Sequence, residues 1–215
     1  MAYKTRLGGS NASFDSMMRN GFGIVTVMNA RVYDALSTEK SAGEYYTPAD
    51  FLKEVEKSGN TPLCTLDTLK IANVTMEGPS KTVTGGQYSN PLVKFGKSCR
   101  LEMQDALGNK DAIKALCGGI VDTAGKVLSF GENFEGPKTI IGDTFFIDQK
   151  TGEQVKVKII FYSFLPDSLF NLTQDAEGDA TVFDMNGDLM TTLVKIDTST
   201  TGVFYSIVEP TAAAA

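Results

Sequence analysis

Apolar and polar residues alternate along much of the chain, which is the period of a β-strand with one buried and one solvated face. The segment 91–105 shows this pattern most clearly. Its apolar face is formed by Val93, Phe95, Cys99, Leu101 and Met103, and its polar face by Lys94, Ser98, Arg100, Glu102 and Gln104. The segments 21–34 and 66–76 predict two further strands.

Two β-hairpins are predicted in the second half of the chain. The first spans 142–164 and has its tip at 150–152, with apolar and lysine residues alternating after the tip. The second spans 181–197 and turns at Asn186-Gly187, a dipeptide that strongly favours a two-residue hairpin turn. The segment 203–208 predicts a closing strand.

Two short helices carry clear start and stop signals. The first is predicted from an N-cap at Thr47, with Asp50 completing a capping-box pattern and Gly59 ending the helix. The second begins at Asn109 and ends at Gly118. Each has an apolar stripe for packing on another element.

These elements amount to roughly seven to nine strands and two helices, which is typical of a mainly β protein. We expect an antiparallel β-sandwich or barrel with one or two short flanking helices and a long projecting hairpin. Residues 1–20 form a predicted extended arm, 21–210 the domain and 211–215 a disordered tail. The loop 77–91 is far longer than the roughly 2–5 residues that a hairpin needs.

Composition removes several classes of chemistry. The 215-residue chain contains no histidine, which excludes His-dependent nucleophile activation and His-ligated zinc. Its formal net charge of −6 argues against a protein that coats nucleic acid. Three separated cysteines indicate reduced, buried thiols. No signal peptide or membrane span is indicated, and we expect no cofactor and no enzymatic activity.

Clusters of acidic or basic residues have a simple interpretation as solvated surface. Asp184, Asn186 and Asp188 match the first half of a calcium loop, but Gly187 is misplaced and the terminal Glu is missing, so a solvated hairpin turn is favoured. Carboxylate-dependent glycoside hydrolysis is disfavoured because the acidic residues are scattered and no Trp is present. A loose basic group is interpreted as a solvated face; it contains Lys70, Lys81, Lys94, Lys97 and Arg100.

The segment EGPSKTVTGGQYSNPLVKFGKSCRLEMQDALGN (77–109) resembles the central part of major tail (tail tube) proteins from phages of Gram-positive bacteria. The resemblance is clearest over 66–120. The matching positions are Lys81, Thr82, Gly85, Gly86, Gln104, Asp105, Ala106 and Leu107.

This resemblance implies a structural subunit that forms hexameric rings, which stack into a tube through which DNA passes without specific binding. The implied partners are the chain itself, a tape measure protein and a tail terminator, in a virion tail assembled in the host cytoplasm. The implied inter-subunit hairpin residues are Lys81, Thr82, Gly85, Gly86, Gln87 and Tyr88. The implied lumen-facing residues are Lys94, Arg100, Glu102 and Gln104.

Three alternatives stay open. The chain could be another virion part, such as a tail terminator or a capsid decoration protein. It could be a β-sandwich module that binds a carbohydrate or a receptor, although it lacks Trp for a sugar platform. The last is an enzyme that uses carboxylate-bound metal.

Overall fold

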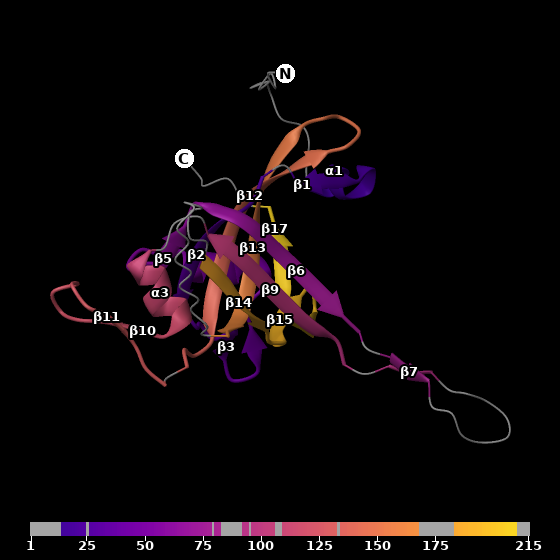
Figure 1. The fold of residues 1–215 in the computed structure, drawn as a ribbon. Helices are drawn as coiled ribbons and strands as arrows, with labels where there is room; N and C mark the ends of the chain where they lie inside the picture. Colours follow the sequence, from indigo (N-terminus) through magenta and orange to yellow (C-terminus); the bar gives the residue numbers. More distant parts are fainter. Residues whose placement is uncertain are drawn as a thin grey trace.

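The computed structural model describes residues 14–24, 26–78, 80–82, 92–94, 96–105, 109–132, 134–167 and 183–209. It confirms the mainly β fold with antiparallel strands and few short helices (Figure 1). The described helices are α1 (Phe14–Asn20), α2 (Pro48–Val55) and α3 (Lys110–Cys117). The predicted tail 211–215 lies outside the described residues, as do Gly85, Gly86, Gln87, Tyr88, Ala106 and Leu107.

Nine strands of the described residues form the main sheet, in the order β5-β2-β12-β13-β14-β9-β6, with β1 added on β12 and β17 on β13. Their bounds are β1 (Phe22–Ile24), β2 (Asn29–Asp34), β5 (Cys64–Leu66), β6 (Leu69–Glu77), β9 (Ser98–Asp105), β12 (Lys138–Asp148), β13 (Gln154–Pro166), β14 (Phe183–Leu189) and β17 (Tyr205–Val208). In the described residues, the sheet ends at β5 on one side and at β6 on the other.

In the part of the chain that the structure describes, four two-stranded ribbons accompany the main sheet. They are formed by β3 (Glu39–Ser41) with β4 (Glu44–Tyr45), β7 (Ser80–Thr82) with β8 (Leu92–Lys94), β10 (Gly119–Val121) with β11 (Leu128–Phe130), and β15 (Thr192–Ile196) with β16 (Ser199–Val203). The β7–β8 and β10–β11 ribbons extend away from the body of the molecule in different directions (Figure 1).

The core lies on both faces of the main sheet. Helix α3 packs its Ile113 and Leu116 against the inner face, in a cluster that includes Leu101 and Phe161. Helix α2 covers part of the outer face, where Phe51 contacts Tyr162 with ring centroids 5.1 Å apart. The two amphipathic helices therefore occupy opposite faces of the sheet, as their apolar stripes require.

The capping residues read from the sequence mark the starts of α2 and α3 and the end of α3 in the structure. The Thr47 hydroxyl accepts a hydrogen bond from the backbone N–H of Asp50 at 3.2 Å, and the Asn109 side chain accepts one from Asp111 at 2.9 Å. Gly118 ends α3 in the left-handed region with a φ of 69°. The predicted caps are confirmed, except that α2 ends at Val55, before Gly59.

The predicted hairpin 142–164 is also confirmed, as β12 and β13. Asp148 holds its turn by accepting hydrogen bonds from the backbone N–H groups of Lys150 (2.7 Å) and Thr151 (3.0 Å). A register shift near Lys138 changes the alternation, so that Phe161 and Phe164 both enter the inner core. This hairpin is the centre of the sheet.

The prediction of an extended arm over residues 1–20 is wrong for its last seven residues, which form α1. Met17 is fully buried against Phe146 and Val155, and an ion pair joins Arg19 to Asp15 one turn earlier at 3.0 Å. Burial of one methionine on the sheet therefore favours a helix where the polar composition predicted none. Residues 1–13 lie outside the described residues.

The segment 21–34 is not one strand but two. β1 pairs with β12 at 146–148, whereas β2 pairs with β12 at 138–143 on the same edge. Between them the chain leaves the ladder, and the Thr144 hydroxyl donates a hydrogen bond to the carbonyl oxygen of Thr26 at 2.9 Å. The segment 91–105 is likewise interrupted, because β8 ends at Lys94 and β9 begins at Ser98.

The predicted hairpin turn at Asn186-Gly187 is wrong, because β14 runs straight through both residues. Gly187 allows the backbones of β14 and β13 to approach each other closely. A Cβ atom there would lie 2.2 Å from the carbonyl oxygen of Leu165 and 2.7 Å from the ring of Phe164. The turn of this region occurs between β15 and β16, where Asp197 has a positive φ of 53°.

Candidate assembly surface

The outer face of β14, β9 and β6 is a polar surface. Strand register sets Arg100, Glu102 and Gln104 of β9 opposite Asp188, Asn186 and Asp184 of β14. Cys99, Leu101 and Met103 point to the inner core instead. The predicted alternation of buried and solvated residues in this strand is confirmed.

Ion pairs organise this polar surface around one arginine. Arg100 contacts Asp167, lies 3.2 Å from Asp188 Oδ1 through Nη1, and lies 3.8 Å from Glu102 Oε1 through Nε. The hydrogen bond to Asp167 raises the pKa of the Arg100 guanidinium above its ordinary value. Gln104 donates a hydrogen bond to Asp184 at 2.9 Å.

The polar surface is therefore acidic. Three carboxylates, on Glu102, Asp167 and Asp188, contact the guanidinium of Arg100, and a fourth, on Asp184, lies beside Gln104. The sequence interpretation missed Asp184 and Asp188 because it placed them in a turn. The alternation of Phe183, Met185, Gly187 and Leu189 with Asp184, Asn186 and Asp188 is the signal that would have placed them on one strand.

The remaining candidate residues lie elsewhere. Lys94 belongs to β8 on the projecting ribbon, so the structure does not bring it together with Arg100, Glu102 and Gln104. Lys81 and Thr82 belong to β7, opposite Val93 and Leu92. Part of the segment predicted as a loop is thus a paired ribbon that prolongs the hairpin of β6 and β9 (Figure 1).

Strand β6 is a long sheet edge with little cover. It pairs with β9 along one side, and its other side has no strand partner in the described residues. Almost all of its nine residues are exposed. They include the apolar side chains of Ile71, Val74 and Met76, which are 41%, 36% and 50% exposed.

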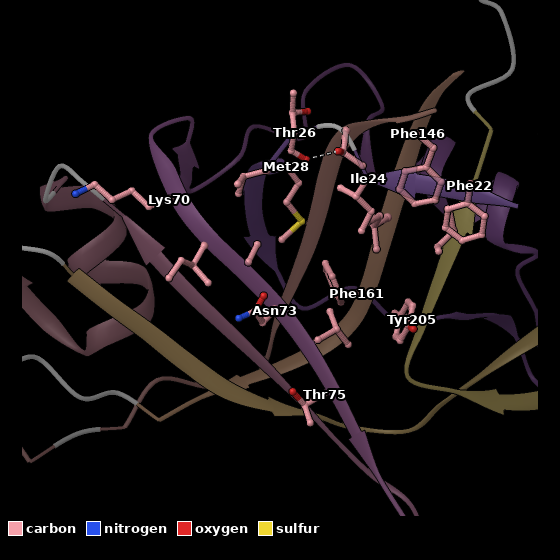
Figure 2. A pocket seen from close by; sticks show the side chains of 17 residues that line it. Phe22, Ile24, Thr26, Met28, Lys70, Asn73, Thr75, Phe146, Phe161 and Tyr205 are labelled. Atoms are coloured by element: carbon pink, nitrogen blue, oxygen red, sulfur yellow. Dashed lines mark hydrogen bonds between the residues drawn. The ribbon is translucent and has the colours of Figure 1, made fainter. Parts of the chain in front are cut away.

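A groove of about 900 Å³ lies between β6 and the strands that face it, and is called the β6 groove below. Its lining residues are Phe22, Ile24, Thr26, Val27, Met28, Lys70, Ile71, Ala72, Asn73, Val74, Thr75, Thr144, Phe146, Ile159, Phe161, Tyr205 and Ile207. Figure 2 shows β6 crossing one side, with Lys70 and Thr75 toward its two ends, and Phe22, Phe146 and Tyr205 on the other. The lining is mostly apolar, and Lys70 is the one charged side chain among the described residues that form it.

Four charged side chains attach α2 to the outer face of the sheet. Glu56, which caps the end of α2, contacts Lys158 and lies 2.6 Å from Nη2 of Arg31. The same Nη2 atom lies 2.7 Å from Asp143, and Lys158 lies 3.7 Å from the other Asp143 oxygen. A carboxylate at a helix C-terminus opposes the helix dipole, so these two cations explain how Glu56 is accommodated there.

Acid is expected to weaken this attachment. Burial raises the pKa of Glu56, but hydrogen bonds from Lys158 and Arg31 outweigh it, so the pKa lies below its ordinary value of 4.5. A carboxyl group with a lowered folded-state pKa contributes stability that is complete above its unfolded-state pKa and is lost as the pH falls through the folded-state value. We expect the free energy of unfolding to fall more steeply from about pH 5 to about pH 3 in the native chain than in Glu56→Gln.

Urea titrations at each pH measure this slope, and only the slope is compared, because the substitution also changes stability at neutral pH. Equal slopes in the two proteins would contradict the assignment.

Other chemistry has little support in the described residues. The cysteines are free and buried as predicted, and burial raises the pKa of Cys64 to about 12 and that of Cys117 to about 11. No group of three or more acidic, Cys or His residues there could hold a metal ion. None of the described helices is long and apolar enough to cross a membrane.

Comparison with known proteins found no matching family model and no matching curated protein.

Proposed function

We propose that this chain is a structural subunit that assembles with copies of itself into stacked rings, forming a tube through which DNA is delivered, as in the phage tail tube proteins that it resembles. The observation that carries the proposal is the β6 edge, which is nine residues long, exposed and continuous with the projecting β7–β8 ribbon. The hexameric ring number comes from the resemblance.

An exposed strand edge of this kind favours pairing with another chain. Unpaired N–H and C=O groups along a strand offer a template for another chain, and monomeric proteins usually protect such edges with charges, prolines or bulges. β6 has a register irregularity only near its start, between Leu69 and Ile71, and beyond it exposes Ile71, Val74 and Met76 between the charges of Lys70 and Glu77. A neighbouring copy that covers this strand would remove both the unpaired backbone groups and the apolar side chains from water.

The acidic outer face supports a role as a DNA conduit. Glu102, Asp167 and Asp188 contact Arg100, and Asp184 lies beside Gln104, so these side chains carry four negative charges and one positive charge. A wall of this sign repels phosphates, and the one cation described on it, Arg100, is already paired with carboxylates. DNA would then slide past the polar surface without sticking to it.

The β7–β8 ribbon supplies the contact between stacked rings in this proposal. Lys81 and Thr82 lie on β7, and Gly85, Gly86, Gln87 and Tyr88 belong to the same predicted hairpin. A repeated head-to-tail contact closes into rings in one direction and extends without limit in the other. A tape measure protein inside the tube and a tail terminator at its end are the proposed partners, in a virion tail assembled in the host cytoplasm.

Assembly at rising protein concentration tests the proposal. We expect negative-stain electron microscopy to show rings and tubes for the native chain. Met76→Asp should raise the protein concentration needed for assembly by on the order of tenfold or more. Burying a methionine side chain between two copies stabilises their contact by about 1.5–3 kcal/mol, and the substitution removes that contribution. Met190→Asp is the matched control, since Met76 and Met190 are both 50% exposed.

Monomers at every concentration would contradict the proposal. Single rings that never stack would favour a tail terminator instead. A monomer that binds glycans would favour the carbohydrate-binding module.

A further inference from the structure

The β10–β11 arm, defined here as residues 119–132 together with Phe134, is an apolar projection on the surface. Phe134 is 81% exposed, Val127 54% and Ile120 53%. Ile120 lies on the ribbon, Val127 lies just before β11, and Phe134 lies four residues after β11 ends. Exposed apolar groups of this kind mark a binding surface.

The arm and the β6 groove lie on different sides of the molecule. In Figure 1 the arm extends to the left beyond α3, while β17, a strand that lines the groove, lies on the right with β6. The arm of one chain therefore does not fill its own groove. A second copy placed beside the first can offer its arm to that groove.

The groove has the size and the lining to receive the arm. An apolar cavity of about 150 Å³ holds one benzene molecule, so about 900 Å³ accommodates several side chains of aromatic size. Phe146 and Phe161 form its buried floor, and Ile24 is 68% exposed at its margin. Aromatic side chains seated in such pockets dominate the stability of protein interfaces.

Charge complements this fit. Lys70 is the one charged residue among the described residues that line the groove. The arm carries Glu132 two positions before Phe134, and both Lys70 and Glu132 are exposed. With Phe134 in the groove, Glu132 lies near its margin, where an opposite charge fixes orientation more than it adds affinity.

We propose that the β10–β11 arm of one chain inserts into the β6 groove of the next copy, with Phe134 on the groove floor and Glu132 beside Lys70. The contact is heterologous, because it joins two different surfaces of the same chain. It deepens the proposed function by naming a contact between neighbouring copies, and it rests on that function.

Cross-linking tests the contact directly. Glu132→Cys protein is mixed with Lys70→Cys protein under assembly conditions and treated with a short bismaleimide. The native thiols stay silent because all three are buried. A surface ion pair contributes little to the stability of a contact. Loss of the Glu132 or Lys70 charge should therefore leave the apolar contact between the arm and the groove in place. Neighbouring thiols reach an effective concentration near millimolar, so we expect at least about tenfold more covalent dimer than from Glu132→Cys mixed with Lys156→Cys.

Cross-linking of a chain that carries both cysteines distinguishes a heterologous contact from a two-fold symmetric one. A heterologous contact yields a ladder of dimers, trimers and larger species, whereas a two-fold symmetric contact yields dimers only. Phe134→Asp in the same background should abolish the ladder. Because Phe134 is 81% exposed, this substitution leaves the fold intact, and an unchanged melting temperature confirms that.

The outcomes separate the two proposals. Rings or tubes without cross-linking above the control would overturn the arm–groove contact and leave the proposed function standing. Cross-linked species without rings or tubes would support the contact and contradict the tube. A monomer that binds a hydrophobic dye in the groove and never cross-links would identify a small-molecule site and overturn the contact.

Discussion

Gly187→Ala is expected to lower the free energy of unfolding by about 3 kcal/mol, the upper end of the usual cost of overpacking. The added Cβ would lie 2.2 Å from the Leu165 carbonyl oxygen, a backbone atom that cannot rotate away. It would also meet the ring of Phe164 at 2.7 Å. To relieve these contacts, β14 must move away from β13, and only three register pairs join the two strands.

Thermal and urea unfolding measure this loss, which corresponds to about 6–12 °C in melting temperature for a chain of this length. Gly23→Ala is the matched control. Gly23 also lies within a strand of the main sheet, but its Cβ would meet Ile147 at 3.5 Å, an ordinary contact distance. We expect that control to change stability by less than about 1 kcal/mol. Equal effects of the two substitutions would contradict the close-approach role of Gly187.

Lys158→Met is expected to lower the free energy of unfolding by about 2–3 kcal/mol, because it leaves two partly buried carboxylates to share one guanidinium. Lys158 contacts Glu56 and lies 3.7 Å from Asp143 Oδ1, a buried atom with no hydrogen-bond partner in the described residues. The side chain of Lys158 is only 13% exposed, so solvent compensates little for its loss. The C-terminal end of α2 should loosen first, because Glu56 is its cap.

Urea unfolding and hydrogen exchange of α2 measure the two effects. Lys156→Met is the control, since Lys156 is exposed and lies two residues earlier on the same face of β13. Surface substitutions of that kind change stability by about 0.5 kcal/mol or less. If both variants lost the same stability, the four-charge cluster would have no special role.

Elements with signals inside their own sequence were predictable. The α3 boundaries follow from Asn109 and Gly118, because a side-chain cap and a left-handed glycine act within one turn of the helix. The β12–β13 hairpin follows from alternation and from a polar tip. Neither prediction needs any knowledge of which distant segment lies alongside.

Elements decided by distant neighbours were not predictable. Asn186-Gly187 has the composition of a turn, but Gly187 is required by the approach of Leu165, about twenty residues away in sequence. The helix α1 depends on burial of Met17 against β12 and β13. In both places tertiary packing overrides local propensity.

The candidate surface was predictable only in part. Alternation correctly placed Arg100, Glu102 and Gln104 on one solvated face. The charge of that face depends on Asp167 and Asp188, which approach Arg100 only through the pairing of β14 with β9 and β13. The groove has no sequence signature at all, since its lining comes from several strands far apart in the chain.

The narrow junction between β13 and β14 has a mechanical consequence for any filament of these subunits. In the described residues, three register pairs on that seam connect the β14–β9–β6 layer to the rest of the sheet, whereas β12 and β13 are paired along most of their length. Strand pairing at this seam is therefore less extensive than at the centre of the sheet, and packing of Leu101, Met103 and Met185 with Phe161 and Phe164 in the inner core also holds the layer in place. If the proposed tube bends, we expect the rotation within each subunit to be largest at this seam, where three residue pairs join the two layers.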